Sequence, residues 1–271
     1  MSSNMKKLSL LFLFSISTLI LNAQDTKSGF IKSTDMKDWG FSITPYAFLA
    51  AQATDVGGER LRRSFNDLSS ITNSGFQIVL TARYKRFSFL YDGTFATLGV
   101  NEPQGPLKLD LEIKQRIFDF KLNYMILSDF GFGEDEVLKG WSLELGLGGK
   151  YWKNDVTIDY AVIINDTPIL EDRINQPQEW WDLMVGVKPK FIISDRFLLS
   201  AAVNVGGFGI GNSSKFSIDF TYLNSFRISN LILIDAGFRS FRYKRIDGEG
   251  ENELQTVVNV LGPLLGVSIV F

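Results

Sequence analysis

From residue 39 onward, hydrophobic and polar residues alternate along the chain. The segment FQIVLTARY (76–84), for example, places its largest apolar residues at every second position. A period of two is that of a β-strand, whose successive side chains point to opposite faces. The pattern predicts ten strands, at about 39–50, 75–85, 86–98, 107–127, 140–163, 180–194, 196–208, 214–228, 230–243 and 254–271.

The connections between these strands alternate in length. Tight turns at 85–86, 194–196 and 229–230 and a medium link at 128–139 are interleaved with mostly longer connections at 51–74, 99–106, 164–179, 209–213 and 244–253. Short periplasmic turns and long extracellular loops are typical of transmembrane β-barrels. The predicted fold class is therefore all-β, an antiparallel up-and-down transmembrane barrel of about ten strands over 39–271, with both ends on the periplasmic side.

The segment LKLDLEIKQRI (107–117) raises the question of which face is outside. In a soluble barrel or sandwich the aliphatic residues would turn inward, and the period alone permits this. The predicted strands are long, however, as membrane-crossing strands must be. We therefore expect Leu107, Leu109, Leu111 and Ile113 to face lipid and the interleaved charges to face the lumen. The phase slips at 117–118, where a β-bulge is expected to keep both faces consistent.

Aromatic residues gather near the strand ends, as the two interfacial girdles of a membrane barrel require. Phe87 and Phe197 fall on the short-turn side, and Phe48 and Tyr243 fall toward the long loops. The tryptophans predicted to form the aromatic girdle are Trp39 and Trp141 on the short-turn side and Trp152, Trp180 and Trp181 on the long-loop side.

The first 23 residues have the pattern of a cleaved signal peptide. Lys6 and Lys7 precede an apolar stretch at 8–21, and LNA (21–23) is a tolerable cleavage site. A retained N-terminal anchor is the alternative. Cleavage leaves a short periplasmic segment, 24–38, before the barrel. The mature chain keeps 26 of the 28 basic and all 30 acidic residues, a net charge of −4 that gives no reason to expect a nucleic-acid partner.

Cysteine and histidine are both absent from the 271 residues. This excludes disulfides, lipoprotein anchoring, Cys/His metal sites and every mechanism that needs an imidazole base. We expect a protein that is not an enzyme, with no catalytic residue, cofactor or metal. Three features are weaker indications of a functional site. Asp182 lies beside Trp180 and Trp181 and could be an acid in an aromatic pocket, and the acidic run at 134–136 could hold a cation. The segment GGFGIG (206–211) is rich in glycine but lacks the spacing of a dinucleotide site.

The chain ends LGVSIVF (265–271), with Gly266, Ile269 and Phe271 at the end of a strand. This ending resembles the C-terminal signal that the outer-membrane barrel assembly machinery reads. Other segments are similar to an uncharacterised family of Gram-negative outer-membrane β-barrel proteins: WGFSITPYAF (39–48), GGKYW (148–152), SDRFLL (194–199), NVGGFGIG (204–211) and GPLLGVSIVF (262–271). The resemblance implies an outer-membrane location, with membrane lipids and the assembly machinery as partners and no catalytic residue.

The alternation of side chains between the two faces of each predicted strand assigns many charged residues to the lumen. Ten strands enclose an interior little wider than that of eight, which side chains fill. Charges in so narrow a space are expected to pair, because an unpaired charge away from bulk water is costly. The predicted lumen charge network is Arg83, Lys85, Asp92, Lys108, Asp110, Glu112, Lys114, Arg116, Asp119, Lys121, Glu144, Lys150, Asp182, Lys188, Lys190, Asp219, Arg227, Asp235 and Arg239.

The first long loop has two interpretations. Apolar residues at 61, 65, 68 and 71 recur at nearly helical spacing beside arginines at 60, 62 and 63. They predict either a short amphipathic helix at the barrel mouth or membrane surface, or an ordinary solvated loop.

The leading functional hypothesis is a non-enzymatic outer-membrane barrel with a largely closed lumen, acting as a scaffold or surface-binding protein and expected to be a monomer. The alternatives are a narrow channel for small solutes or anions, an outer-membrane enzyme acting on lipid or peptide, and a soluble periplasmic β protein whose apolar residues face inward and whose charged residues face water.

Overall fold

The computed structural model describes residues 38–104, 107–132, 138–164, 167–248, 250 and 253–271. The predicted signal peptide, all of the 24–38 segment but Asp38, and the acidic run at 134–136 lie outside the described residues.

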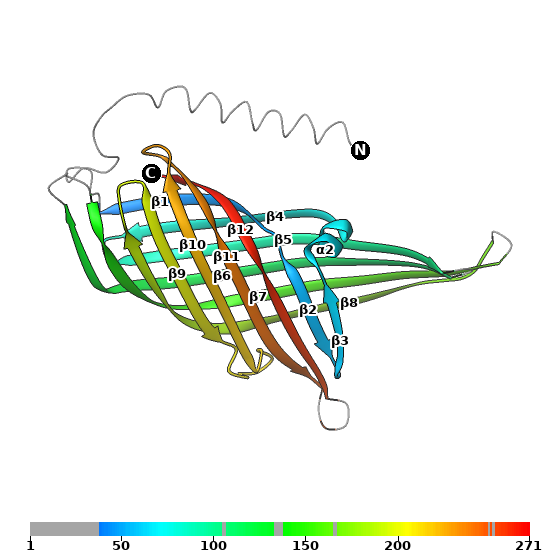
Figure 1. The fold of residues 1–271 in the computed structure, drawn as a ribbon. Helices are drawn as coiled ribbons and strands as arrows, with labels where there is room; N and C mark the ends of the chain where they lie inside the picture. Colours follow the sequence, from blue (N-terminus) through cyan, green and yellow to red (C-terminus); the bar gives the residue numbers. More distant parts are fainter. Residues whose placement is uncertain (1–37, 105–106, 133–137, 165–166, 249, 251–252) are drawn as a thin grey trace.

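Ten strands form a closed antiparallel barrel, in which each strand pairs with the next along the chain and the last pairs with the first (Figure 1). This confirms the predicted fold class and the ten predicted strands. The barrel strands are β1 (Trp39–Phe48), β4 (Thr72–Tyr84), β5 (Phe87–Gln104), β6 (Leu107–Phe132), β7 (Leu138–Ile164), β8 (Thr167–Ile192), β9 (Phe197–Gly206), β10 (Phe216–Arg227), β11 (Ile232–Asp247) and β12 (Leu254–Val270).

The first long loop folds into a hairpin and a short helix. Strand β2 (Ala51–Val56) pairs with β12, β3 (Glu59–Arg63) pairs with β2, and helix α2 (Phe65–Ile71) follows. Ser64 begins the helix with a capping box: its hydroxyl accepts from the Asp67 amide at 3.3 Å, and its own amide donates to the Asp67 carboxylate at 2.8 Å. The prediction of a short helix is therefore confirmed for residues 65–71, whereas the arginine-rich residues 60–63 form part of a strand.

The side chains on the two faces of the barrel have the inverted polarity of a membrane protein. Leu147 on the outer face is 57% exposed, whereas Asp119 and Lys150 on the inner face are each 1% exposed. The apolar outer face therefore contacts lipid, and the charged side chains are enclosed in the lumen. Within the described ranges, no helix is long and apolar enough to cross a bilayer.

Four strands, β5 to β8, continue far beyond the closed wall (Figure 1). Strand β4 pairs with β5 only as far as Thr72, opposite Leu98, and β9 pairs with β8 only from Met184 toward the periplasmic end. Past those points, the described residues of the four strands pair only with one another. We call this extension, residues 99–113 and 156–175 where described, the protruding sheet.

The expected β-bulge at 117–118 is wrong. The β5–β6 register runs unbroken from Phe87 to Gln104, and the register shift between β6 and β7 lies at Met125–Leu127 instead. Without a bulge, Leu111 and Ile113 share the inner face with Asp119 and do not face lipid. The described charges of the segment, Asp110, Glu112, Lys114 and Arg116, lie on the outer face, in or at the base of the protruding sheet. The side chains of Leu107, Lys108 and Leu109 are outside the description.

Candidate functional site

Six charged side chains meet at the centre of the lumen. Lys150 Nζ lies 2.6 Å from Asp219 Oδ2 and 3.5 Å from Asp119 Oδ2, and Lys121 Nζ lies 2.9 Å from Asp119 Oδ2. Arg239 uses Nη1 to bind Asp92 at 2.8 Å and Nη2 to bind Asp219 at 3.0 Å. We call these residues (Asp92, Asp119, Lys121, Lys150, Asp219 and Arg239) the central ion cluster.

The central ion cluster joins opposite walls of the barrel. The Lys150–Asp219 pair links β7 to β10, and the Arg239–Asp92 pair links β11 to β5. Tyr46 on β1 adds a further link, because its hydroxyl donates to Asp92 Oδ1 at 2.7 Å and accepts from Arg239 Nη1 at 2.8 Å. Three acids and three bases balance one another, so burial of the group leaves no net charge to be solvated.

A second polar group lies toward the periplasmic end. Glu144 accepts from Lys190 Nζ at 2.5 Å and from the Ser88 hydroxyl at 3.5 Å, and Lys188 lies opposite it on β8. Across the lumen, Asp235 accepts from the hydroxyls of Ser225 and Ser268.

An aromatic compartment lies on the extracellular side of the central ion cluster. Its buried residues are Ile117, Trp152, Trp180, Tyr243, Val258 and Val260, with Phe48 and Phe241 packed against them. The rings of Trp152 and Trp180 stack with centroids 5.6 Å apart and an angle of 13° between their planes. The Arg245 guanidinium lies 4.3 Å from the Trp180 ring centroid.

Asp182 anchors the β9–β10 loop to this compartment. Its carboxylate accepts from Trp152 Nε1 at 3.1 Å, from the Ser214 amide at 2.7 Å and from the Ser214 hydroxyl at 2.9 Å. Gly207, in the GGFGIG segment, has φ +85° and approaches so closely that a Cβ would lie 2.4 Å from the Ser214 carbonyl oxygen. The glycines therefore let the loop close on the rim.

The prediction that Trp152 and Trp180 belong to the outer girdle is wrong. They are 1% and 4% exposed, inside the barrel, because they share the inward parity of Lys150 and Asp182. Trp39, Trp141 and Trp181 do lie exposed on the outer face.

Trp181 belongs to a band of rings that crosses four strands. Phe95 and Phe118 have centroids 5.3 Å apart, Phe118 and Tyr151 6.0 Å, and Tyr151 and Trp181 4.9 Å. We call these four residues the extracellular belt. Such a band marks a membrane–water interface.

Several charges assigned to the lumen lie elsewhere. Lys85 pairs with Asp38 at 3.6 Å in the periplasmic turn. Glu112 pairs with Lys114 at 2.8 Å, and Arg116 lies 3.9 Å from Asp155, all on the outer face. Asp110, next to Glu112 on that face, lies in the protruding sheet. Arg83 and Arg227, by contrast, do lie on the inner face, at the periplasmic end of the lumen: Arg83 pairs with Gly40 and contacts the Lys85 carbonyl, and Arg227 is buried and donates to the Asn230 carbonyl.

Sequence reasoning missed Tyr46, Ser214 and Arg245, all of which contact residues of the interior. The signal for Tyr46 was its parity, since it shares the inner face of β1 with Thr44 and Phe48. Among the described residues, no acidic residues are grouped so that they could hold a metal ion.

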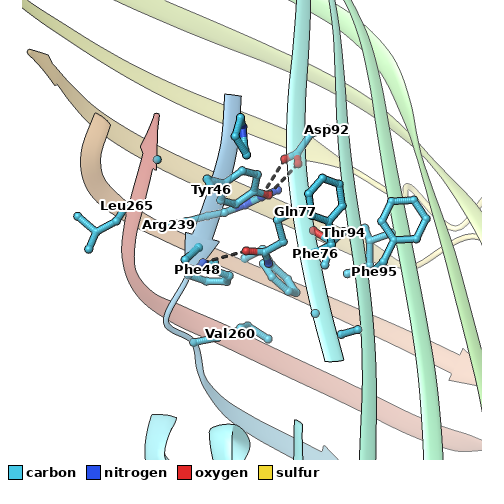
Figure 2. A pocket seen from close by; sticks show the side chains of 18 of the residues that line it. Tyr46, Phe48, Phe76, Gln77, Asp92, Thr94, Phe95, Arg239, Val260 and Leu265 are labelled. Atoms are coloured by element: carbon cyan, nitrogen blue, oxygen red, sulfur yellow. Dashed lines mark hydrogen bonds and ion pairs between the residues drawn. The ribbon is translucent and has the colours of Figure 1, made fainter. Parts of the chain in front are cut away.

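A cavity opens beside the aromatic compartment, between β1 and β4 (Figure 2). Its lining includes Tyr46, Phe48, Gln77, Asp92 and Arg239. The Phe48 amide donates to Gln77 Oε1 at 2.8 Å across this space.

No family model matches the chain, and no curated protein matches it in sequence. Solved outer-membrane barrels do match in structure. The outer membrane protease OmpT from Escherichia coli superposes with a TM-score of 0.57 at 10% identity, over 88% of this chain and all of that one. Ail of Yersinia pestis, solved in complex with a heparin analogue, gives a TM-score of 0.38 at 12% identity, over 87% of this chain and all of that one.

The likeness to OmpT shows the fold and nothing of the chemistry, because the identity is low. With the lipid-facing outer surface and the extracellular belt, it shows that this chain is an outer-membrane β-barrel of Gram-negative type that crosses the membrane by its strands.

Proposed function

We propose that this protein is a non-enzymatic integral outer-membrane barrel with a closed lumen, acting as a membrane scaffold or surface-binding protein. The observation that carries the proposal is the central ion cluster, which spans the lumen from β7 to β10 and from β5 to β11. An ion crossing this layer would have to separate buried pairs, and breaking such a pair costs about 3–5 kcal/mol.

The arrangement of the carboxylates supports a non-enzymatic role. Asp92, Asp119 and Asp219 are each within 3 Å of a lysine or arginine nitrogen, so all three carboxylates are engaged in ion pairs inside the barrel. The sequence offers no histidine to replace them.

The protruding sheet supports the surface-binding part of the proposal. Its outer face carries charges of both signs, such as Asp159 and Arg173, whereas Leu111, Ile113, Ile158 and Ile174 lie on its inner face. A sheet that offers one charged and one apolar face beyond the membrane is suited to contact another molecule.

Single-channel recording in a planar bilayer tests the closed lumen. The refolded mature chain (from Gln24) is expected to insert and stay silent. The neutral double variant Lys150→Met with Asp219→Asn removes the link between β7 and β10 and is expected to give discrete openings.

A matched variant, Asp159→Asn with Arg173→Met, removes an ion pair from the protruding sheet and should remain silent. Insertion is checked in every case by the heat-dependent shift of the folded barrel on a detergent gel. Stable openings of the unaltered chain would refute the proposal and favour the narrow channel.

A further inference from the structure

The barrel wall is interrupted between β1 and β4. The ladder that joins these strands runs from Trp39, opposite Tyr84, to Pro45, opposite Ile78, and ends there. Proline has no amide hydrogen to donate to a ladder. Beyond Pro45, β1 pairs with β12, and β4 continues to Thr72 paired with β5. The two strands therefore separate on the extracellular side of this point.

One side chain bridges the gap. Gln77 accepts the hydrogen bond from the Phe48 amide at 2.8 Å, which takes the place of a ladder bond (Figure 2). This single hydrogen bond contributes only modestly to stability, whereas several backbone bonds hold the strands together along the ladder. The closure is therefore weaker here than anywhere along the β1–β4 ladder below it.

The cavity beside the aromatic compartment passes through this gap. On the inner side it is lined by Phe48, Trp152 and Val260, and on the outer side by Ala47, Phe76 and Leu265. The outer-side residues point away from the lumen by parity. The cavity thus connects the aromatic compartment directly with the lipid-facing surface.

The gap lies at the level of the extracellular belt. Phe76 on β4 pairs with Phe95 on β5, whose ring packs on Phe118. A molecule that enters from the side at this level comes from the outer leaflet. The part of an outer-leaflet lipid that suits an aromatic lining at this depth is its acyl chain.

The interior end of the cavity also suits an apolar chain. Phe48, Phe241 and Tyr243 line it, and the central ion cluster closes it below as a layer without net charge. We propose that the opening between β1 and β4 admits one acyl chain of an outer-leaflet lipid into the aromatic compartment. This inference adds a lipid-binding site and does not require that the lumen conduct.

Tryptophan fluorescence tests the proposal in the intact mature chain. Of the five tryptophans, Trp39, Trp141 and Trp181 face lipid, so replacing these three with phenylalanine leaves only Trp152 and Trp180 in the lumen. Bromine quenches an indole only at short range. In bilayers of phospholipid brominated on its acyl chains, this variant is expected to lose fluorescence relative to bilayers of the unbrominated lipid.

Two glycine substitutions in that background provide a matched pair. Gly75→Phe places a ring on the inner side of the gap, in the lining of the cavity, where a Cβ would meet no atom closer than 3.8 Å; it is expected to block the cavity and restore the fluorescence. Gly131→Phe makes the same change near the periplasmic end of β6, where a Cβ has nothing within 4 Å, and should leave the quenching intact.

A second closure guards against a misfolded variant. The chain has no cysteine, so Ala47→Cys with Phe76→Cys can be joined across the gap by a bismaleimide, and the unjoined double variant is its control. Joining is expected to abolish the quenching. Three results would overturn the proposal: no quenching in the open barrel, quenching that survives both closures, or quenching by free brominated fatty acid added from water without quenching by the brominated phospholipid.

Discussion

The membrane wall and the protruding sheet are built from the same strands, yet their faces have opposite polarity. On β6, the outer positions in the wall are apolar, as at Phe118 and Leu122, and those further out are charged, as at Lys114. The inner positions change the other way, from Asp119 in the wall to Ile113 above it. The register is continuous through the change. The strand has kept its pairing, and only its surroundings have changed.

The neighbouring strands change at the same level. On β7 the outer face passes from Tyr151 to Lys153, and on β8 from Trp181 to Glu179. Lys153 Nζ and Glu179 Oε2 lie 3.4 Å apart, directly beyond the extracellular belt. Aligned changes on adjacent strands define the membrane boundary, because a charge on the lipid side of it would be costly.

Ion pairs differ between the two regions in the same way. The central ion cluster is enclosed, whereas Arg173 and Asp159 form a bidentate pair on the exposed face of the protruding sheet, with Nε–Oδ1 at 2.5 Å and Nη2–Oδ2 at 2.9 Å. Geometry is good in both places. Burial is what separates them, since solvent screens the exposed outer pair, whereas Asp119, Lys150 and Asp219 of the inner cluster are almost fully buried.

The largest expected effect comes from breaking an inner pair. Asp219→Ala leaves Lys150 and Arg239 buried without the carboxylate they share. We expect the free energy of unfolding to fall by about 3–5 kcal/mol, the usual cost of removing one partner of a buried pair. Urea unfolding of the barrel in lipid bilayers, followed by the heat-dependent gel shift, measures it.

The matched change in the protruding sheet is Asp159→Ala, which breaks the Arg173 pair. The denaturant midpoint of the barrel should not change. Equal losses for the two variants would mean that the lumen is as wet as the protruding sheet, and the comparison would fail.

A charge introduced on the outer face should lower the free energy of unfolding in the membrane wall but not in the protruding sheet, by a somewhat smaller amount than the loss of an inner pair. Leu147 lies between Trp141 and Tyr151 on the lipid-facing side of β7, so Leu147→Arg is expected to cost about 2–4 kcal/mol. Thr157, further along the same face, lies opposite Glu112 in the protruding sheet. Thr157→Arg should leave stability unchanged or slightly improved. A large loss at Thr157 would place the membrane boundary further out than the extracellular belt.

Much of the fold could be predicted because a period of two and alternating loop lengths are local signals. They gave the ten strands, the closure and the inverted faces without knowledge of any contact. The protruding sheet could not be predicted this way. Alternation looks the same on both sides of the membrane boundary, and the change of solvent at residues 117–118 was mistaken for a β-bulge.

The interior tryptophans carried a usable signal. Trp180 and Trp181 are adjacent on one strand, so they cannot both face lipid. Trp180 has the parity of Asp182, and Trp152 has the parity of Lys150, which already placed both among the lumen charges. The gathering of aromatic residues near the strand ends suggested an interfacial girdle. Whether a side chain faces lipid or the lumen, however, is decided by its odd or even position along the strand.

The pairing of the central ion cluster was only partly predictable. Parity placed Lys150, Asp219 and Arg239 in the lumen, but it does not say which strands face one another across it. Strands β7 and β10 are brought together by the curvature of the closed barrel, which no local pattern encodes. The gap between β1 and β4 had one sequence signal, Pro45, because a proline in a strand marks a place where the ladder can end.

The smallest expected effect is a shift in the titration of an exposed carboxyl. The hydrogen bonds and charge of Arg173 hold the pKa of Asp159 below its usual value. Because the pKa is depressed in the folded state, the pair stabilises the protruding sheet above the ordinary aspartate pKa, and this contribution is lost as the pH falls through the folded pKa.

Arg173→Gln should therefore return the pKa of Asp159 toward its usual value, as followed by carboxyl ¹³C NMR of aspartate-labelled protein. Arg116→Gln is the control, because Arg116 lies near Asp155 and should leave the Asp159 titration where it was. The heat-dependent gel shift should be the same for both variants and the unaltered chain, since salt and water screen charges in this region. If Asp159 titrated identically with and without Arg173, the pair would not exist in solution, and the protruding sheet would owe its order to its backbone ladder alone.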